Sequence, residues 1–393
     1  MNNEKYILAG GKVVTPHRVI DGGAIFVENS RIKSILEQIP NAGNGDWEIV
    51  DCAGKIIMPA FIDVHTHGGI GLDFNDDKPG TFEKLSQYYY SHGVTTVLAT
   101  HSPLSYPLLI PAVTRVAEFC SQHLGDTNIF GIHLEGPYIN RAMRGGNRDD
   151  YIELPDFERW RAVLKAGRGF IRLMTVAPEL PGIMPIIDDA VRNGIRISVG
   201  HSSADGVTMA LAIEKGATQV THLFNSMPGL YHRESDILAE SLLNDKIDAQ
   251  LIADGIHVHP KIAQLAIKLK GTEHIILITD SIRATQVGDG EYYSAGLKVF
   301  VRNGNVYLED GTLAGSTLVM ERALKMNTAT AGIDLPSASR MTSLNAARSL
   351  GIDKETGSLE SGKWADIVVL DNELNVEMTI RRGKFKYRKS VEA

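Results

Sequence analysis

Residues 58–67 read Met-Pro-Ala-Phe-Ile-Asp-Val-His-Thr-His and place two histidines at the end of a short apolar run. A bounded run of this kind, with β-branched and aromatic members, is typical of a buried β-strand. Side chains alternate along a strand, so His65 and His67 point to the same face and one cation can contact both rings. The pair alone is a weak signal, and its place at the predicted strand end is what favours metal ligation.

The same arrangement returns further along the chain. Glu135, His201, His222 and Asp280 each end another apolar run, and segments with helical spacing separate the runs. Alternation of strand and helix favours parallel pairing with right-handed crossovers. We therefore predict an α/β fold, a (β/α)8 TIM-type barrel, whose strand ends bring these side chains together above the barrel mouth. The predicted strands are 61–66, 95–99, 128–135, 171–176, 195–200, 218–222, 249–254 and 275–280, and the helices between them include 81–91, 106–123, 155–165, 204–215 and 260–269.

Both ends of the chain have a different pattern. A barrel takes roughly 250 residues, and this chain has 393 residues with 43% apolar content, which leaves room for one smaller companion. Short strand-like pieces separated by Gly, Asn and Asp turns occupy 6–14, 24–28, 31–36 and 47–51, and a matching set follows the last predicted helix at 367–370, 376–380 and 384–387. We predict that residues 1–57 and 351–393 form a small β-sandwich and that residues 58–350 form the barrel. Residues 290–311 are predicted to form an inserted β-ribbon.

Composition and charge exclude several classes of protein. The net charge of −7 arises from 40 basic and 47 acidic residues that are mixed along the chain, without the basic patch that nucleic acid requires. Cys52 and Cys120 stand in unrelated contexts and indicate neither a disulfide nor a cysteine zinc site. The N-terminal residues lack the apolar stretch of a signal peptide, and no later segment is long and charge-free enough to span a bilayer. We expect a cytoplasmic protein without membrane or nucleic-acid partners.

Glu135 points to a divalent cation. A buried carboxylate at a strand end needs a positive partner, because a lone buried charge is costly. A salt bridge to Arg141 or Arg144 would supply one, but His201 and His222 end later strands in the same manner and favour a metal. Two imidazoles and one carboxylate with an open position form a known catalytic zinc set, which iron, cobalt or manganese can also occupy.

Asp280 is the candidate proton carrier. A carboxylate beside an activated water can take its proton and later pass it to a leaving amine, as amide hydrolysis requires. The alternative is a helix cap for the following segment, and the neighbouring strand-end ligands favour catalysis. His133 has the same strand parity as Glu135, and both a packed core histidine and a partner of the site are open for it.

The loops after the sixth and seventh predicted strands carry groups suited to an anion. Asn225, Arg233 and His257 supply an amide, a guanidinium fork and an imidazole. Together they suit an anionic substrate such as a phosphate ester. Each of them alone is more typical of an ordinary loop residue.

With these residues in place, the chain resembles the N-acetylglucosamine-6-phosphate deacetylases of the metal-dependent amidohydrolase superfamily over essentially its full length. The motifs that carry the resemblance are Pro59-Ala-Phe-Ile-Asp-Val-His-Thr-His67, Gly131-Ile-His-Leu-Glu-Gly-Pro137, Val199-Gly-His-Ser202, Thr221-His-Leu-Phe-Asn225, Leu251-Ile-Ala-Asp-Gly-Ile-His257, Thr279-Asp280 and Asp310-Gly-Thr-Leu-Ala-Gly-Ser316.

The resemblance implies roles for individual residues. Glu135, His201 and His222 bind the principal metal, while His65 and His67 offer a second site bridged by Glu135. Asp280 becomes the catalytic acid and base. The family's contacts to phosphate and sugar fall on Asn225, Arg233 and His257, with the arginine reaching across a homodimer interface. Asn147 stands near the position where relatives place His or Gln against the acetyl carbonyl, and Ser226 replaces a common Ala at the sugar end.

The expected activity is removal of the acetyl group from N-acetylglucosamine 6-phosphate, with one or two divalent metals per chain. N-acetylgalactosamine 6-phosphate is the alternative substrate, because the epimer changes only rim contacts. A cyclic amidohydrolase or nucleobase deaminase is a further alternative, although the ring hydrolases generally use a carboxylated lysine on the fourth strand and residues 171–176 contain none. A non-catalytic scaffold on the same fold is the third, and such a scaffold would be expected to have lost ligands that this chain keeps.

Overall fold

The computed structural model describes residues 5–38 and 47–390. The chain divides into two compact units, one of Val64–Ser86 and Val97–Val319 and one of Met1–Asp63, Gln87–Thr96 and Met320–Ala393. Residues 1–4, part of the N-terminal stretch in which we expect no signal peptide, lie outside the described residues. Among the residues that are described, no helix is both long and apolar enough to cross a membrane.

An eight-stranded sheet forms the barrel, as predicted. The strands follow chain order across the sheet, and the ladders from β9 to β15 are parallel. At the rim the backbone N–H of Asp280 donates to the carbonyl of His65 at 2.9 Å and joins the two edge strands. The strands are β6 (Phe61–Thr66), β9 (Val94–His101), β10 (Ile129–Glu135), β11 (Ile171–Val176), β12 (Arg196–Val199), β13 (Ala217–Val220), β14 (Asp248–Ile252) and β15 (Ile275–Ile278).

Four strands end earlier than the sequence predicts. We expected β12, β13, β14 and β15 to continue to residues 200, 222, 254 and 280, but they end at Val199, Val220, Ile252 and Ile278. His201, His222 and Asp280 lie just beyond β12, β13 and β15, with φ of 48°, 30° and 48°. This left-handed backbone cannot continue a strand, so the three side chains project from the turns above the barrel.

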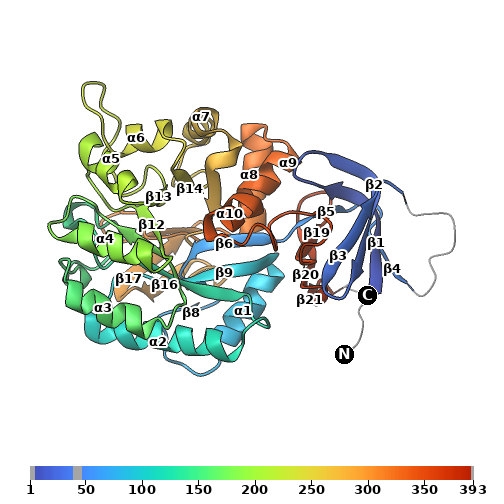
Figure 1. Cartoon of the computed structure of the whole chain (residues 1–393), viewed down its shortest axis with the longest axis horizontal. Helices are drawn as coiled ribbons and strands as arrows, with labels where there is room; N and C mark the ends of the chain where they lie inside the picture. The colour runs from blue at the N-terminus through green and yellow to red at the C-terminus, as the bar shows by residue number, and fades with distance from the viewer. Residues whose placement is uncertain (1–4, 39–46, 391–393) are drawn as a thin grey trace. The chain divides into compact units, whose positions relative to one another are not determined.

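Helices connect the barrel strands and lie outside them (Figure 1). Aspartate caps begin several of them: the carboxylates of Asp156, Asp205 and Asp236 accept from the third backbone N–H that follows, which satisfies a donor that the helix leaves unpaired. The helices are α1 (Thr81–Ser91), α2 (Tyr106–Gln122), α3 (Phe157–Ala166), α4 (Ile183–Arg192), α5 (Gly206–Glu214), α6 (Ile237–Leu243) and α7 (Pro260–Lys270), with short 3₁₀ turns at Arg141–Met143, Asp149–Tyr151 and Thr272–His274.

The predicted ribbon after β15 is confirmed. It consists of β16 (Gly290–Ser294), β17 (Leu297–Arg302) and β18 (Asn305–Tyr307), paired antiparallel. Asn303 and Gly304 make the tight turn between the last two strands with φ of 51° and 73°, as the Asn-Gly pair predicts. A second small hairpin, β7 (Gly68–Gly69) with β8 (Leu72–Asp73), follows β6.

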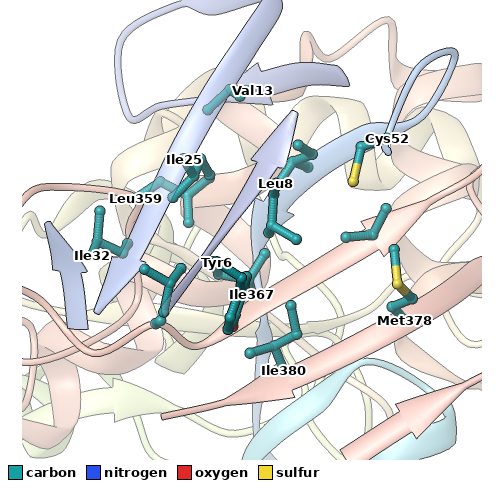
Figure 2. Packing of buried hydrophobic residues seen from close by; sticks show 14 of the residues in the cluster. Tyr6, Leu8, Val13, Ile25, Ile32, Cys52, Leu359, Ile367, Met378 and Ile380 are labelled. Carbon is teal, nitrogen blue, oxygen red and sulfur yellow. The ribbon is translucent and has the colours of Figure 1, made fainter. Parts of the chain in front are cut away.

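Both termini contribute to one further sheet, which confirms the predicted small β domain. Its order is β21-β20-β19-β5-β1-β2-β3, with β4 paired to β1. Strands from both ends of this order share one apolar cluster, in which Ile25 of β2 and Ile380 of β20 take part (Figure 2). The strands are β1 (Lys5–Val14), β2 (Val19–Glu28), β3 (Arg31–Leu36), β4 (Glu48–Asp51), β5 (Ile56–Pro59), β19 (Ile367–Leu370), β20 (Val376–Arg381) and β21 (Lys384–Arg388).

The helices α8 (Met320–Ala331), α9 (Leu335–Ser339) and α10 (Asn345–Leu350) precede β19, and a π-helical turn, Arg340–Leu344, joins the last two. Strand β5 was not expected, because its residues are continuous in the sequence with the apolar run of β6.

Candidate active site

One carboxylate stands at the centre of the barrel mouth. Oε1 of Glu135 lies 3.2 Å from the Nε2 atoms of His65, His201 and His222, and Oε2 lies 3.3 Å from Nε2 of His67. All five side chains are buried. Residues far apart in the chain therefore meet at one point, as the strand-end pattern predicts.

The donor atoms form two groups that could each hold a metal ion. One comprises Glu135, His201 and His222, and the other comprises His65, His67 and Asp280. In the second group Oδ1 of Asp280 lies 3.1 Å from Nε2 of His67 and 3.5 Å from Nε2 of His65.

The spacing of these donors fits a divalent cation. Ligands about 2.0–2.1 Å from a tetrahedral ion are about 3.3 Å from one another. In the first group the separations from Oε1 of Glu135 are 3.2 Å, and the Nε2 atoms of His201 and His222 are 3.0 Å apart. The chemistry of both groups, imidazole and carboxylate, suits zinc and its transition-metal neighbours.

The second nitrogen of several imidazoles is held by a neighbour. Nδ1 of His201 lies 2.8 Å from the backbone carbonyl of Met143, and Nδ1 of His67 lies 3.0 Å from Oγ of Ser102. A carbonyl can only accept, so Nδ1 of His201 carries the proton and Nε2 presents its lone pair to the site. Such partners fix the tautomer and the orientation of a metal-binding ring.

The close packing of two ligand turns depends on a glycine. Gly200 precedes His201, and a Cβ on it would lie 2.5 Å from Cβ of Thr221, which precedes His222. Only glycine allows the two turns to approach so closely.

The electrostatics of the site favour added positive charge. Burial alone would raise the pKa of Glu135, but His65 and the close imidazoles of His201 and His222 hold it well below its usual value. Burial would likewise raise the pKa of Asp280, and the neighbouring His65 and His67 lower it. Two ionised carboxylates are thus buried among imidazoles, which is costly without a compensating cation.

Two questions left open by the sequence, the salt-bridge partner of Glu135 and the role of His133, are answered by the observed contacts. Arg141 pairs with Asp149 at 2.6 Å, while the carboxylate of Glu135 faces imidazoles. His133 is buried beside His65 with ring centroids 4.6 Å apart, and hydroxyl groups of Thr100 and Thr175 lie 3.2 and 2.8 Å from its two nitrogens. His133 is therefore a packed core residue whose ring contacts that of His65.

A cavity of about 210 Å³ opens beside the metal-binding groups. Asn147, Asn225, Ser226 and His257, the residues proposed from the sequence as substrate contacts, are among those that line it. His257 is held by Asp254 at 2.7 Å; burial opposes its protonation, but this carboxylate raises the pKa of His257.

Arg233 is not among the residues that line this cavity. It lies exposed, with its Nε donating to Nε2 of His232 at 3.2 Å. Of the three residues predicted to bind phosphate, Asn225 and His257 line this cavity and Arg233 does not.

Several lining residues were not expected. Ser102, Ser294 and Ala295 contribute, together with the segment 312–315. The last of these falls within the Asp310–Ser316 motif of the resemblance, which offered a signal. Ser102 and Ser294 are small polar residues without a distinctive pattern.

The fold and the site define a class of protein: the chain belongs to the amidohydrolase family, whose sequence model matches residues 56–386. Within that family it is similar to particular deacetylases. It is 34% identical to an N-acetylglucosamine-6-phosphate deacetylase of Bacillus subtilis over 98% of both chains, and 30% identical to an N-acetylgalactosamine-6-phosphate deacetylase of Escherichia coli O157:H7 over 96% of this chain and 98% of that one. The structure matches that of a Mycobacterium smegmatis N-acetyl-D-glucosamine-6-phosphate deacetylase mutant in complex with N-acetyl-D-glucosamine-6-phosphate, with a TM-score of 0.92, 30% identity and coverage of 98% and 99%. The resemblance drawn from the sequence motifs is thereby confirmed.

Proposed function

We propose that this protein is a metal-dependent hydrolase that removes the acetyl group from N-acetylglucosamine 6-phosphate and releases glucosamine 6-phosphate and acetate. The observation that carries this proposal is the convergence of two metal-binding groups on a cavity lined by Asn225 and His257. The deacetylases to which the chain is similar over nearly its full length support the choice of substrate.

In this proposal Glu135, His201 and His222 would hold the principal cation, and His65 and His67 would hold a second one together with Glu135, which gives one or two per chain. Zinc suits the donors best, with iron, cobalt or manganese as alternatives. When bound, the metal supplies Lewis acidity, which activates water and polarises the acetyl carbonyl.

Asp280 moves the protons. Its depressed pKa keeps the carboxylate ionised at neutral pH, so it accepts a proton from the attacking water. The same carboxyl then protonates the amine as the amide bond breaks. No helix begins at Asp280 in the described part of the chain, which weakens the capping alternative.

The cavity residues recognise the amino sugar phosphate. Asn225 and His257 contact the phosphate, Ser226 lies at the sugar end, and Asn147 donates to the acetyl carbonyl. An imidazole with a raised pKa is a suitable donor to a phosphate oxygen.

Arg233 completes the phosphate site of a neighbouring subunit in a homodimer. Its exposure and its absence from the lining of its own cavity support this arrangement. Large apolar side chains are also exposed on α5, α6 and α7, which suits an interface: Val207, Leu211, Leu243, Ile262, Leu265 and Leu269.

We also place the domain limits at 1–57 with 351–393 for the small β domain and 58–350 for the barrel. A cytoplasmic location belongs to the same proposal. It is supported by Cys52 and Cys120, which are buried free thiols, as expected in a reducing compartment.

The direct test is turnover by the purified protein. N-acetylglucosamine 6-phosphate and N-acetylgalactosamine 6-phosphate are supplied separately, and acetate release is followed by NMR. We expect the gluco substrate to give the higher kcat/KM. A higher value for the galacto epimer would reassign the substrate, and release of acetate from neither would reject the deacetylase.

A further inference from the structure

Two glutamine side chains are buried inside the barrel next to the proposed metal site. Gln219 of β13 and Gln250 of β14 are both 0% exposed. Nε2 of Gln250 donates to Oε1 of Gln219 at 2.8 Å, and Oε1 of Gln250 lies 3.0 Å from Nδ1 of His65. Burial of a primary amide is costly unless its groups are hydrogen-bonded, so this arrangement calls for an explanation.

The hydrogen bonds of the pair fix the tautomer of one imidazole, that of His65. Because the amide nitrogen of Gln250 donates to Gln219, its carbonyl faces His65 and can only accept there. Nδ1 of His65 therefore carries the hydrogen. Its Nε2, which lies 3.2 Å from Oε1 of Glu135 and 3.5 Å from Oδ1 of Asp280, keeps a lone pair directed at the site.

The two metal-binding groups are thus oriented by different means. In the Glu135 group a backbone carbonyl, that of Met143, holds Nδ1 of His201. In the group of His65, His67 and Asp280, Nδ1 of His65 is instead held by a side chain, that of Gln250. A substitution at Gln250 can consequently act on one group without direct contact with the other.

We propose that Gln250 is a positioning residue that selects the tautomer of His65 competent to bind the second cation. The proposal rests on the two-cation site described above. It does not require the substrate assignment, because cation binding is measured without substrate.

The test is equilibrium dialysis of the full chain against graded zinc concentrations, with zinc per chain measured by mass spectrometry. Gln250→Met keeps the length of the side chain but removes the oxygen that accepts from His65. If the Met variant does not fold, Gln250→Leu is used in its place. Loss of such a partner typically weakens metal affinity 10- to 100-fold. We expect this loss for the second equivalent of zinc and a change below about threefold for the first.

The matched control is Gln250→Glu, which keeps an acceptor opposite Nδ1 of His65 and should retain the second equivalent within about threefold of the parent. A Glu variant as weak as the Met variant would assign the effect to packing and overturn the proposal. Equal weakening of both equivalents in the Met variant would also overturn it. The proposal would also be overturned if the parent and the His65→Ala variant each bound only one zinc per chain. That result would still be compatible with a deacetylase that uses one metal.

Discussion

The barrel mouth and the core of the small β domain are both buried, but their composition and backbone geometry are opposite. At the mouth, charged and polar side chains are buried, and His201, His222 and Asp280 have left-handed backbones. In the small domain, a cluster that contains Leu8 and Ile25 is almost wholly apolar and is built from regular strands.

The apolar cluster stabilises the fold, whereas the barrel mouth carries the groups suited to chemistry. Left-handed backbone at non-glycine residues costs on the order of 1–3 kcal/mol each, and buried charge costs more. The apolar cluster gains free energy by removing side chains from water. Substitutions at the mouth should therefore change turnover more than stability, and substitutions in the cluster should do the reverse.

Removal of the principal cation should have the largest effect. Chelation should abolish acetate release, and His222→Ala should remove metal and turnover together, because one of three donors is lost. Metal content per chain and initial rates are measured on the same preparations. Full activity in protein shown to contain no metal would refute the proposed chemistry.

Asp280→Asn should have the second-largest effect on turnover. The amide keeps the shape of the side chain but cannot accept and return a proton, and a general acid and base contributes roughly 10²–10⁴-fold. We expect kcat to fall by that factor with less change in KM, at unchanged content of the principal metal. A rate within a few-fold of the parent at matched metal content would remove Asp280 from the mechanism and make His257 the next candidate.

Arg233→Ala tests whether Arg233 recognises the phosphate of the substrate. Loss of a charge-assisted contact should weaken use of the phosphorylated sugar by roughly 2 to 5 kcal/mol, with a smaller effect on the unphosphorylated sugar. Equal losses for both sugars would contradict phosphate recognition.

Hybrid dimers of two variants test whether Arg233 acts in its own subunit's site or in that of its partner. Arg233→Ala chains mixed with Asp280→Asn chains should recover part of the activity, since a hybrid dimer then contains one intact site. Absence of recovery in verified hybrids would place Arg233 in its own subunit's site.

The sequence predicted which segments form the barrel strands, because buried parallel strands are continuous apolar runs, and β6 and β11 have the predicted bounds. It predicted β12, β13 and β15 too long because His201, His222 and Asp280 adopt left-handed turns, which no hydrophobic pattern reveals. It also predicted too late an end for β14. It missed β5 because only Ala60 separates that strand from β6, so the two strands form one apolar run in the sequence.

The ionisable residues of the site were easier to predict from the sequence than the neutral polar residues around them. Glu135 and its histidines were identifiable because buried ionisable residues at strand ends are rare. Ser102 and Gln250 were not, because a small or neutral polar residue inside a strand pattern has no periodic signature. The exposure of Arg233 depends on a loop, where the local sequence determines conformation least.

The apolar cluster of the small domain should respond through stability alone. Ile25→Ala should lower the free energy of unfolding by about 2–5 kcal/mol, and Ile25→Val by about 0.5–1.5 kcal/mol, with kcat/KM unchanged in both. Urea unfolding followed by the fluorescence of Trp47 and Trp364 in a Trp160→Phe background reports on this domain. A fall in kcat/KM at full occupancy of folded protein would show that the two regions are not independent.

The smallest expected effect concerns Cys52 in the same cluster, where burial raises the pKa of the thiol to about 11. Because the folded chain holds this proton above the pH at which the unfolded chain releases it, the thiol's contribution to stability is complete below about pH 8 and declines as the pH rises toward 11. One pKa unit corresponds to about 1.4 kcal/mol, and pH 10 lies about one unit above the ordinary pKa of 9.0, so between pH 7.5 and pH 10 the parent should lose about 1.4 kcal/mol more than Cys52→Ala. The comparison uses the slope with pH rather than the absolute stability, since the alanine also leaves a small cavity and other groups titrate alike in both proteins. Parallel slopes would show that the Cys52 thiol ionises as readily in the folded domain as in the unfolded chain, and that this side of the apolar cluster admits water.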